Sequence, residues 1–292
     1  MAHAELWGVV LAGGEGLRLR SLTTDADGVP VPKQFCSLGN GRSMLGDALD
    51  RIRLRVPPER TFVVVTEAHR RWWEPELAAH PPERIVVQPT NRGTAVGILA
   101  PLQLIAARGP EANVLVAPSD HAVDDATAFE GSLTVALDFV ELRPGRVVLL
   151  GVEPEGPEGA DYGWIVPVPS SGPVRAVSRF VEKPGVERLS ALRAQGGLWN
   201  SFVFVGRVGT LLGLFERTTP ELFRRDPPGR PLDFSRDVLE RVTDALAVVT
   251  VPECGWIDLG TPDRVARCLA RRGRASASTI KIPSNHARSA LA

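Results

Sequence analysis

The chain has 292 residues, with 34 basic and 34 acidic side chains, a formal net charge of zero and 43% hydrophobic residues. This balance gives no sign of binding to nucleic acid or an anionic membrane through bulk charge, and the apolar content suffices for a folded core. No apolar stretch reaches the roughly 18 residues that a membrane helix needs, and the start lacks the basic segment of a secretory signal. Three widely spaced cysteines form no metal or disulfide pattern, so we expect a reduced, cytoplasmic environment.

Apolar, β-branched runs alternate with helical patterns through the first half of the chain. Ser43 is assigned as the N-cap of a helix in which Leu45, Leu49 and Ile52 share one face. The predicted strands cover residues 6–11, 61–66, 84–87, 113–117 and 146–150, and two further helices cover residues 93–107 and 129–141. Alternating strands and helices predict a mainly parallel α/β sheet, whose ligands bind beyond the carboxyl ends of the strands.

From about residue 151 onward, glycine and proline become frequent and the pattern changes. We predict one domain over residues 1–274, with halves of about 1–150 and 151–274, and a flexible tail over residues 275–292. The second half is expected to extend the sheet. It is predicted to contain shorter strands at 164–168, 174–181 and 199–205 around one helix at 186–194, then a strand at 246–251 and a helix at 262–272.

The first predicted strand ends in the glycine-rich run LAGGEGLR, which contains Gly13, Gly14 and Gly16. Such a turn presents backbone N–H groups at one spot, and these groups attract phosphate oxygens. Arg18 and Lys33 follow it and supply full positive charges. The spacing fits neither a dinucleotide fingerprint nor a Walker loop, because the third glycine and the Gly-Lys pair are missing. A tight turn that merely packs a strand against a helix is the alternative.

Two carboxylates also follow strand-like segments. Asp120 ends the run NVLVAPSD, and Asp258 stands in WIDLGTP just before a predicted helix. This position suits Mg²⁺, which takes one or two carboxylates together with phosphate oxygens. An N-cap or a turn is the alternative for each Asp taken singly. The neighbouring His121 is interpreted as a residue that orients the loop.

Other polar residues stand in later turns. Gln88 opens QPTNRGTA, where an amide can pair with a base edge and Gly93 lets the backbone approach a ring. Glu182 and Lys183 stand in FVEKP, and their groups suit sugar hydroxyls and a phosphate. The motifs YGW and WNS place aromatic and amide groups where a sugar ring would rest. Ordinary turns, exposed charge pairs and core aromatics are the alternatives for each motif taken singly.

The motifs LAGGEGLRL, PKQF, QPTNRGTA, PSDH, YGW, FVEKP, WNSFVF and WIDLGTP occur in the order seen in sugar-1-phosphate nucleotidylyltransferases. The chain resembles most the mannose-1-phosphate guanylyltransferase group, over residues 6–265. The resemblance implies a Rossmann-like, mainly parallel mixed sheet flanked by helices, of the nucleotide-diphospho-sugar transferase type, with a smaller sugar-binding lobe. It implies nucleotidyl transfer from GTP to mannose 1-phosphate with release of pyrophosphate, aided by Mg²⁺ or another divalent cation. It implies no nucleic-acid or membrane partner, and members of the group often form homodimers.

The resemblance also implies a role for each matching residue. Arg18, Lys33, Asp120 and Lys183 are then catalytic, and Asp120 and Asp258 bind the metal. The implied nucleotide-binding residues are Leu11, Ala12, Gly13, Gly14, Gly16, Arg18, Gln88, Gly93 and Thr94. The implied sugar-phosphate-binding residues are Tyr162, Gly163, Glu182, Lys183 and Asn200.

The chain departs from the group at several points. Leu17 stands where many members have Thr or Ser, the proline usual after the Arg-Leu pair is missing, and Phe202 replaces a glycine that commonly follows Asn-Ser. A phenylalanine there would reshape the sugar pocket, so another triphosphate or hexose phosphate stays open. Two other functions also stay open. The first is a glycosyltransferase that uses the metal motif of residues 25–27, although this triplet does not follow a strand. The second is a non-catalytic regulatory homologue, against which the retained charged residues argue.

Overall fold

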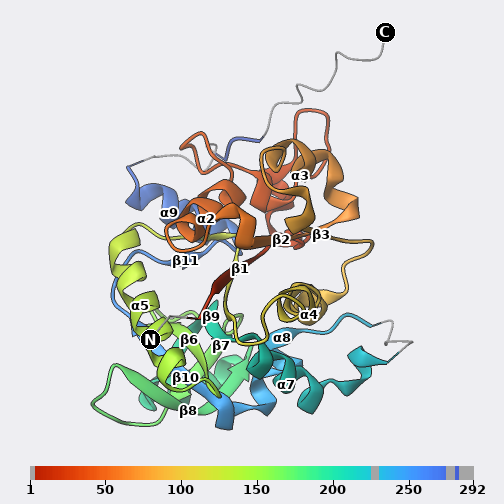
Figure 1. The fold of residues 1–292 in the computed structure, drawn as a ribbon. Coiled ribbons are helices and arrows are strands. Elements are labelled where there is room, and N and C mark those ends of the chain that lie inside the picture. The colour runs from red at the N-terminus through yellow and green to blue at the C-terminus, as the bar shows by residue number, and fades with distance from the viewer. Residues whose placement is uncertain (1–3, 225–229, 274–279, 283–292) are drawn as a thin grey trace.

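The computed structural model describes residues 4–224, 230–273 and 280–282. The strands are β1 Leu6–Leu11, β2 Thr61–Thr66, β3 Ile85–Gln88, β4 Asn113–Pro118, β5 His121–Ala122, β6 Val147–Val152, β7 Gly163–Pro167, β8 Val174–Glu182, β9 Leu198–Arg207, β10 Leu246–Val251 and β11 Ile257–Asp258. The helices are α1 Arg20–Thr23, α2 Met44–Arg53, α3 Arg70–Glu76, α4 Gly93–Ala106, α5 Ala126–Leu142, α6 Leu189–Ala194, α7 Val208–Thr218, α8 Phe234–Asp237 and α9 Pro262–Arg271. Nine strands form one sheet in the order β3-β2-β1-β4-β9-β6-β10-β8-β7, and β5 pairs with β11. Strands β1, β2 and β3 lie next to one another in Figure 1.

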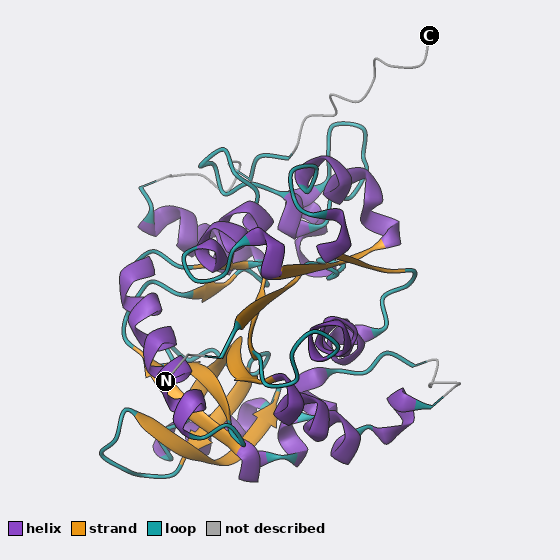
Figure 2. Cartoon of the chain, in the orientation of Figure 1, coloured by secondary structure: helices purple, strands orange, loops and turns teal. Residues whose placement is uncertain are grey.

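Helices cover both faces of this sheet (Figure 2). Successive side chains of a strand point to opposite faces, so a strand that is buried throughout needs a helix layer on each side. In β2, Val63 and Val65 pack into the core that includes α2, α3, α5 and α9. Phe62 and Val64 of the same strand pack into the core that includes α4, α7 and α8. The two cores hold the sheet between them and leave the loops at its edges free for binding.

The first half folds as its periodicity predicts. Strands β1 and β2 have the predicted bounds, and Ser43 caps α2 by accepting a hydrogen bond from the Gly46 N–H at 2.8 Å. Strands β3, β2, β1 and β4 pair in parallel, which brings the turns beyond their carboxyl ends to one edge. The glycine turn, Gln88 and Asp120 consequently lie around one cleft, as predicted.

The second half extends the same sheet, as predicted, and β7 has 5 residues, whereas β8 and β9 are longer, with 9 and 10 residues. Strand β9 has 10 residues and runs antiparallel between β4 and β6, so it joins the two halves. The helix predicted at residues 186–194 is present as α6, which begins at Leu189, whereas α7 and α8 form in residues 206–245, for which the sequence pattern predicted no element. Helix α7 begins at Val208, directly after β9 ends at Arg207, so no turn residue marks the boundary. Its two glycines also weaken the helical signal.

Three residues of the predicted flexible tail are described, and they contact the first half of the chain. Lys281 and Ser37 exchange two backbone hydrogen bonds of 2.9 Å, and Ile280 is 8% exposed. The remaining tail residues, 275–279 and 283–292, lie outside the described residues, so their flexibility and the domain limits stay predictions. Among the helices that the structure describes, none is both long and apolar enough to cross a membrane.

Candidate active site

A cleft with a volume of about 430 Å³ opens beyond the carboxyl ends of β1, β3 and β4 and is lined by both halves of the chain. The predicted site residues that line it are Leu11, Gly13, Gly14, Arg18, Gln88, Gly93, Thr94, Asp120, Tyr162, Gly163, Glu182, Lys183, Asn200 and Asp258. Ala12, Gly16 and Lys33 were predicted with them but do not line the cleft. Residues far apart in the sequence are therefore brought together by the fold.

The glycine turn after β1 presents free backbone donors to this cleft. Gln34 holds the turn from behind, because its Nε2 donates to the carbonyls of Ala12 and Gly14 at 2.8 and 3.0 Å. Within the described part of the chain, the N–H groups of Gly13 and Gly14 donate to no protein acceptor. Gly16 has φ +62°, and a Cβ there would lie 3.2 Å from the backbone nitrogen of Lys33. The turn therefore requires glycine at this position. Adjacent N–H groups without a protein acceptor are what an anion-binding nest offers, so we assign such a nest to this turn.

Lys33 lies behind the cleft wall, where it binds the carboxylate pair. Its Nζ lies 2.9 Å from Asp120 Oδ2 and 3.9 Å from Asp258 Oδ1, and it donates to the Leu259 carbonyl at 3.0 Å. Burial alone would lower the pKa of Lys33, but the charges of Asp120 and Asp258 outweigh it and raise that pKa. For Asp120 the effects are reversed. Burial alone would raise the pKa of Asp120, but the charge of Lys33 outweighs burial and holds that pKa below its usual value. Lysine and carboxylate thus stay charged together.

The two carboxylates come from segments that pair with each other. Asp120 precedes β5, Asp258 ends β11, and the two strands place His121 opposite Asp258. Among the described residues, no group of three or more His, Cys, Asp or Glu side chains could by itself hold a metal ion. Two carboxylates in a cleft still fit Mg²⁺, because this ion commonly takes one or two carboxylates and completes its shell with water and substrate phosphates.

Arg264 of α9 is a site residue that the sequence did not reveal. Its side chain is 3% exposed and donates to Asp258 Oδ2 at 2.9 Å, and it also pairs with Asp161 and Glu158. The guanidinium lies 4.1 Å from the centroid of the Tyr162 ring. In a chain in which arginine supplies nearly all of the basic residues, no motif distinguishes this one. Only the packing of α9 shows that it holds Asp258.

Asp161 links this buried cation to the cleft. Arg18, whose side chain is 54% exposed, donates to Asp161 Oδ2 at 2.7 Å, while the other oxygen of Asp161 accepts from Arg264. Burial would raise the pKa of Asp161, but hydrogen bonds from Arg264 and Arg18 outweigh it and lower that pKa. The carboxylate therefore fixes Arg18 at the cleft rim, within the same cavity as the glycine turn.

Gln88 and the start of α4 form the opposite end of the cleft. Gln88 is 7% exposed, and its Nε2 has no hydrogen-bond partner among the described residues. A buried amide donor without a partner is uncommon in folded proteins and indicates a missing acceptor. Gly93 has φ +86°, and a Cβ there would lie 2.2 Å from the Leu232 carbonyl oxygen. The chain itself therefore requires glycine at this position, before any ligand is considered.

Glu182, Lys183 and Asn200 line the far side of the cleft with Gly163. A Cβ on Gly163 would lie 2.7 Å from Glu182 Oε2 and 3.3 Å from Asn200 Cβ, so glycine keeps these side chains close together. The Glu182 side chain is 7% exposed and lies 3.0 Å from Lys183 Nζ. Burial raises the pKa of Glu182 despite that neighbour. The sequence did not single out Asp233 and Ser235, which also line this side.

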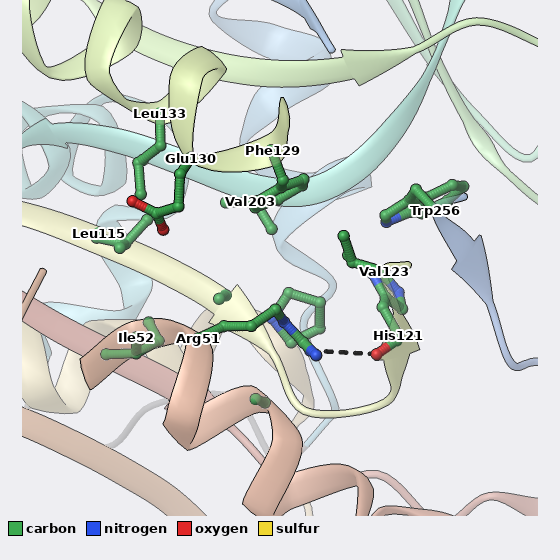
Figure 3. Close-up of a pocket in the computed structure, with 13 residues that line it drawn as sticks. Arg51, Ile52, Leu115, His121, Val123, Phe129, Glu130, Leu133, Val203 and Trp256 are labelled. Atoms are coloured by element: carbon green, nitrogen blue, oxygen red, sulfur yellow. Dashed lines mark hydrogen bonds between the residues drawn. The ribbon is translucent and has the colours of Figure 1, made fainter. Parts of the chain in front are cut away.

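A smaller, mostly apolar cavity of about 30 Å³ adjoins the cleft at His121 (Figure 3). Arg51 donates to the His121 carbonyl at 3.1 Å and so holds β5 against α2. Trp256 lines both cavities, and its ring meets the His121 ring edge to face with centroids 5.1 Å apart. Burial lowers the pKa of His121, so the ring is neutral at neutral pH. These contacts support the interpretation that His121 orients its loop.

Comparison with known proteins agrees with this arrangement. The nucleotidyl transferase family model matches residues 7–270. The chain is similar to mannose-1-phosphate guanylyltransferase of Escherichia coli K12, with 30% identity over 89% of this chain and 59% of that protein. It is similar to the xanthan biosynthesis protein XanB of Xanthomonas campestris pv. campestris B100, with 30% identity over 87% of this chain and 57% of that protein. The chain thus spans less than two thirds of the length of these relatives.

Solved structures share the fold. One described as mannose-1-phosphate geranyltransferase from Thermus thermophilus matches with a TM-score of 0.78 and 28% identity, over 91% of this chain and 79% of that one. A mixed sheet between two helix layers, with a ligand cleft beyond the carboxyl ends of its parallel strands, defines an open α/β protein. The family match extends over both halves of the cleft. The chain belongs to the nucleotidyl transferase family, and the predicted fold class is confirmed.

Proposed function

We propose that the chain transfers a nucleotidyl group from GTP to mannose 1-phosphate, which yields a nucleotide sugar and pyrophosphate. One observation carries this proposal. A single cavity is lined by the anion nest of Gly13 and Gly14, the carboxylates Asp120 and Asp258, and the polar groups around Glu182. A triphosphate and a sugar phosphate can therefore meet in it. The names of the relatives supply the particular substrates.

The reaction needs alignment and charge neutralisation more than a base. A phosphate oxygen of the sugar phosphate attacks the α-phosphorus in line, the bond to the bridging oxygen breaks, and pyrophosphate leaves with the electron pair. The nucleophile is already an anion near neutral pH. The free N–H groups of the glycine turn and Arg18 bind the departing phosphates, and Lys183 reduces repulsion between the two anionic substrates. Asp120 and Asp258 would hold Mg²⁺, or another divalent cation, which supplies Lewis-acid and template chemistry when bound.

Lys33 has a different role in this proposal from a direct phosphate contact. Its ammonium is engaged by Asp120 and the Leu259 carbonyl, so it orients a carboxylate. The catalytic role that the resemblance implies for Lys33 stays a prediction. Location in the cytoplasm and assembly as a homodimer stay predictions as well.

Gln88 supports the choice of a keto base. Its buried Nε2 lacks an acceptor among the described residues and lies beside Gly97, which lines the cleft together with Gln88. Guanine offers the O6 oxygen as an acceptor, whereas adenine offers an amino group at the same position. ATP is therefore expected to bind poorly, and among the keto bases the name of the relative supplies guanine, so GTP is the expected triphosphate.

The glycosyltransferase alternative is disfavoured by the loop that carries its metal motif. Asp25 Oδ1 accepts hydrogen bonds from the N–H groups of Asp27 and Val29 at 3.0 and 2.8 Å, which is ordinary turn chemistry. None of the three residues of this motif lines the cleft. A regulatory homologue is disfavoured because Arg18, Lys183 and both carboxylates are retained.

The test is a coupled pyrophosphate-release assay over a grid of four nucleoside triphosphates and several hexose 1-phosphates. Asp120→Asn and Asp258→Asn should each lower kcat by on the order of 10²-fold or more while the far-UV circular dichroism stays that of the wild type. Asp244→Asn makes the same change at a surface ion pair with Arg217 and should leave turnover unchanged. Wild-type turnover in either cleft variant would remove the carboxylates from the mechanism.

A further inference from the structure

Among the described residues, two that are not glycine have a left-handed backbone conformation, and both line the cleft. The φ angle is +47° at Lys183 and +59° at Phe202. An L-residue in this region is strained because its Cβ approaches the following carbonyl oxygen, and a bulky side chain there is an outlier. Such strain persists where the surroundings over-determine the backbone, and it gathers at functional sites. Phe202 is informative because its side chain brings no charge to the cleft.

Hydrogen bonds on both sides hold Phe202 in this conformation. Its N–H donates to Asn200 Oδ1 at 3.1 Å, while Ser201 Oγ donates to the Leu150 carbonyl at 2.6 Å and accepts from the Val203 N–H at 3.2 Å. The register between β6 and β9 shifts here, which marks a bulge that re-aims the side chains of β9. Because its Oδ1 is engaged, Asn200 has its amide nitrogen left to donate to a ligand.

A cluster of phenylalanines supports the ring from one side. The centroid of Phe202 lies 6.3 Å from those of Phe204 and Phe234, which stack on each other at 5.1 Å. Phe204 and Phe234 are 1% and 0% exposed, whereas Phe202 is only partly buried and lines the cleft. The Phe234 N–H donates to Thr94 Oγ1 at 2.8 Å, so this cluster connects the nucleotide side of the cleft with β9. Phe202 is therefore a fixed apolar part of the cleft wall.

We infer that Phe202 is a specificity-determining residue, which selects a neutral hexose 1-phosphate that turns carbon-bound hydrogens toward the ring. The inference rests on the proposed function and deepens it to the choice of sugar. A phenyl ring accepts and donates no ordinary hydrogen bond, so a hydroxyl, amino or carboxylate group pressed against it loses water without replacement. Glu182 and Asn200 receive the hydroxyls on the other side. Selection thus combines hydrogen bonds to the right sugar with rejection of the wrong one.

The experiment measures kcat/KM of the wild type and of Phe202→Ala with mannose 1-phosphate, glucose 1-phosphate and glucosamine 1-phosphate. The wild type should prefer one neutral hexose 1-phosphate, and the ratio of its kcat/KM to that of the other sugar phosphates should fall at least roughly tenfold in the variant. The change should appear in the KM of the sugar phosphate. Its KM for GTP should stay within about twofold of the wild type, because the inference places the ring against the sugar and not against the base. Phe204→Leu alters the same cluster without lining the cleft and should keep the wild-type preference. An unchanged preference in folded Phe202→Ala overturns the inference.

Two further measurements separate this inference from the proposed function. If the wild type releases no pyrophosphate from any substrate pair, the proposed function fails, and calorimetric binding of GDP-mannose and GDP-glucose then tests Phe202 alone. The ratio of the two dissociation constants should be at least roughly tenfold smaller in Phe202→Ala than in the wild type. An equal ratio, or no binding by the wild type, overturns the inference. Phe202→Gly should melt at least about 2 °C above Phe202→Ala, because glycine relieves the left-handed backbone. Equal melting temperatures would remove the strain from which the inference starts.

Discussion

Arg264→Met is the substitution that tests the buried charge network most directly. Methionine keeps the apolar stem of the side chain and removes the guanidinium that pairs with Asp258, Asp161 and Glu158. The Arg264 side chain is 3% exposed, so water cannot replace it readily. We expect the variant to fold and to be destabilised by about 3 kcal/mol.

The expected loss of stability depends on which partners each of the three carboxylates keeps in Arg264→Met. Removing one partner of a buried ion pair costs about 3–5 kcal/mol, because the other partner is left unpaired. The low end applies here because Asp161 and Glu158 are 32% and 37% exposed, and Asp161 keeps Arg18. Asp258 is 17% exposed and keeps only the more distant Lys33 and His121, each at 3.9 Å among the described residues, so most of the loss falls on it. At roughly 2–4 °C per kcal/mol, the melting temperature should fall by about 6–12 °C.

The assay is thermal unfolding followed by near-UV circular dichroism, with two companion variants. Arg264→Lys keeps the charge but loses the planar fork and the stacking on Tyr162, so it should fall between the wild type and Arg264→Met. Arg267→Met removes a neighbouring arginine that also binds Glu158 but is 46% exposed, and it should cost less than about 1 kcal/mol. A melting temperature of Arg264→Met within about 2 °C of the wild type, or an equal loss in Arg267→Met, would refute this account.

Three further predictions concern the cleft. Gln88→Leu removes a buried donor that has no protein partner, so kcat/KM for GTP should fall about tenfold in the pyrophosphate assay without any loss of thermal stability. Glu182→Gln should raise the melting temperature at pH 7.5. Burial raises the pKa of Glu182, so the folded state binds its proton more tightly than the unfolded state and the carboxylate costs stability as pH rises. The advantage of this variant should disappear toward about pH 4 in a pH series of thermal scans, and an advantage that grows toward acid would contradict the sign. Gly93→Ala should cost at least about 2 kcal/mol in urea unfolding, with or without nucleotide, because its Cβ meets the Leu232 carbonyl. An unchanged free energy of unfolding in Gly93→Ala would show that the segment around Leu232 moves aside.

Local patterns in the sequence predicted the elements that build the first-half side of the cleft. The apolar runs of β1 and β2 have their predicted bounds, and the hydroxyl of Ser43 caps α2 as expected. These features depend on residues that are close in the chain, such as a buried run, a cap or a glycine turn. The order of parallel strands then determines where their carboxyl ends meet, so the shared cleft for Gln88 and Asp120 was also predictable.

The sequence by itself thus determined the class of fold, the family motifs and most of the residues that line the cleft. Only the tertiary structure decided how their charges are paired. Lys33 lies against Asp120 behind the cleft wall, and Arg264 joins Asp258 to Asp161. These pairs join residues far apart in the chain, or involve an arginine-rich helix with no distinguishing motif, so no local pattern encodes them. Burial determines which ionic groups must find a partner, and burial exists only once the sheet and both helix layers have packed.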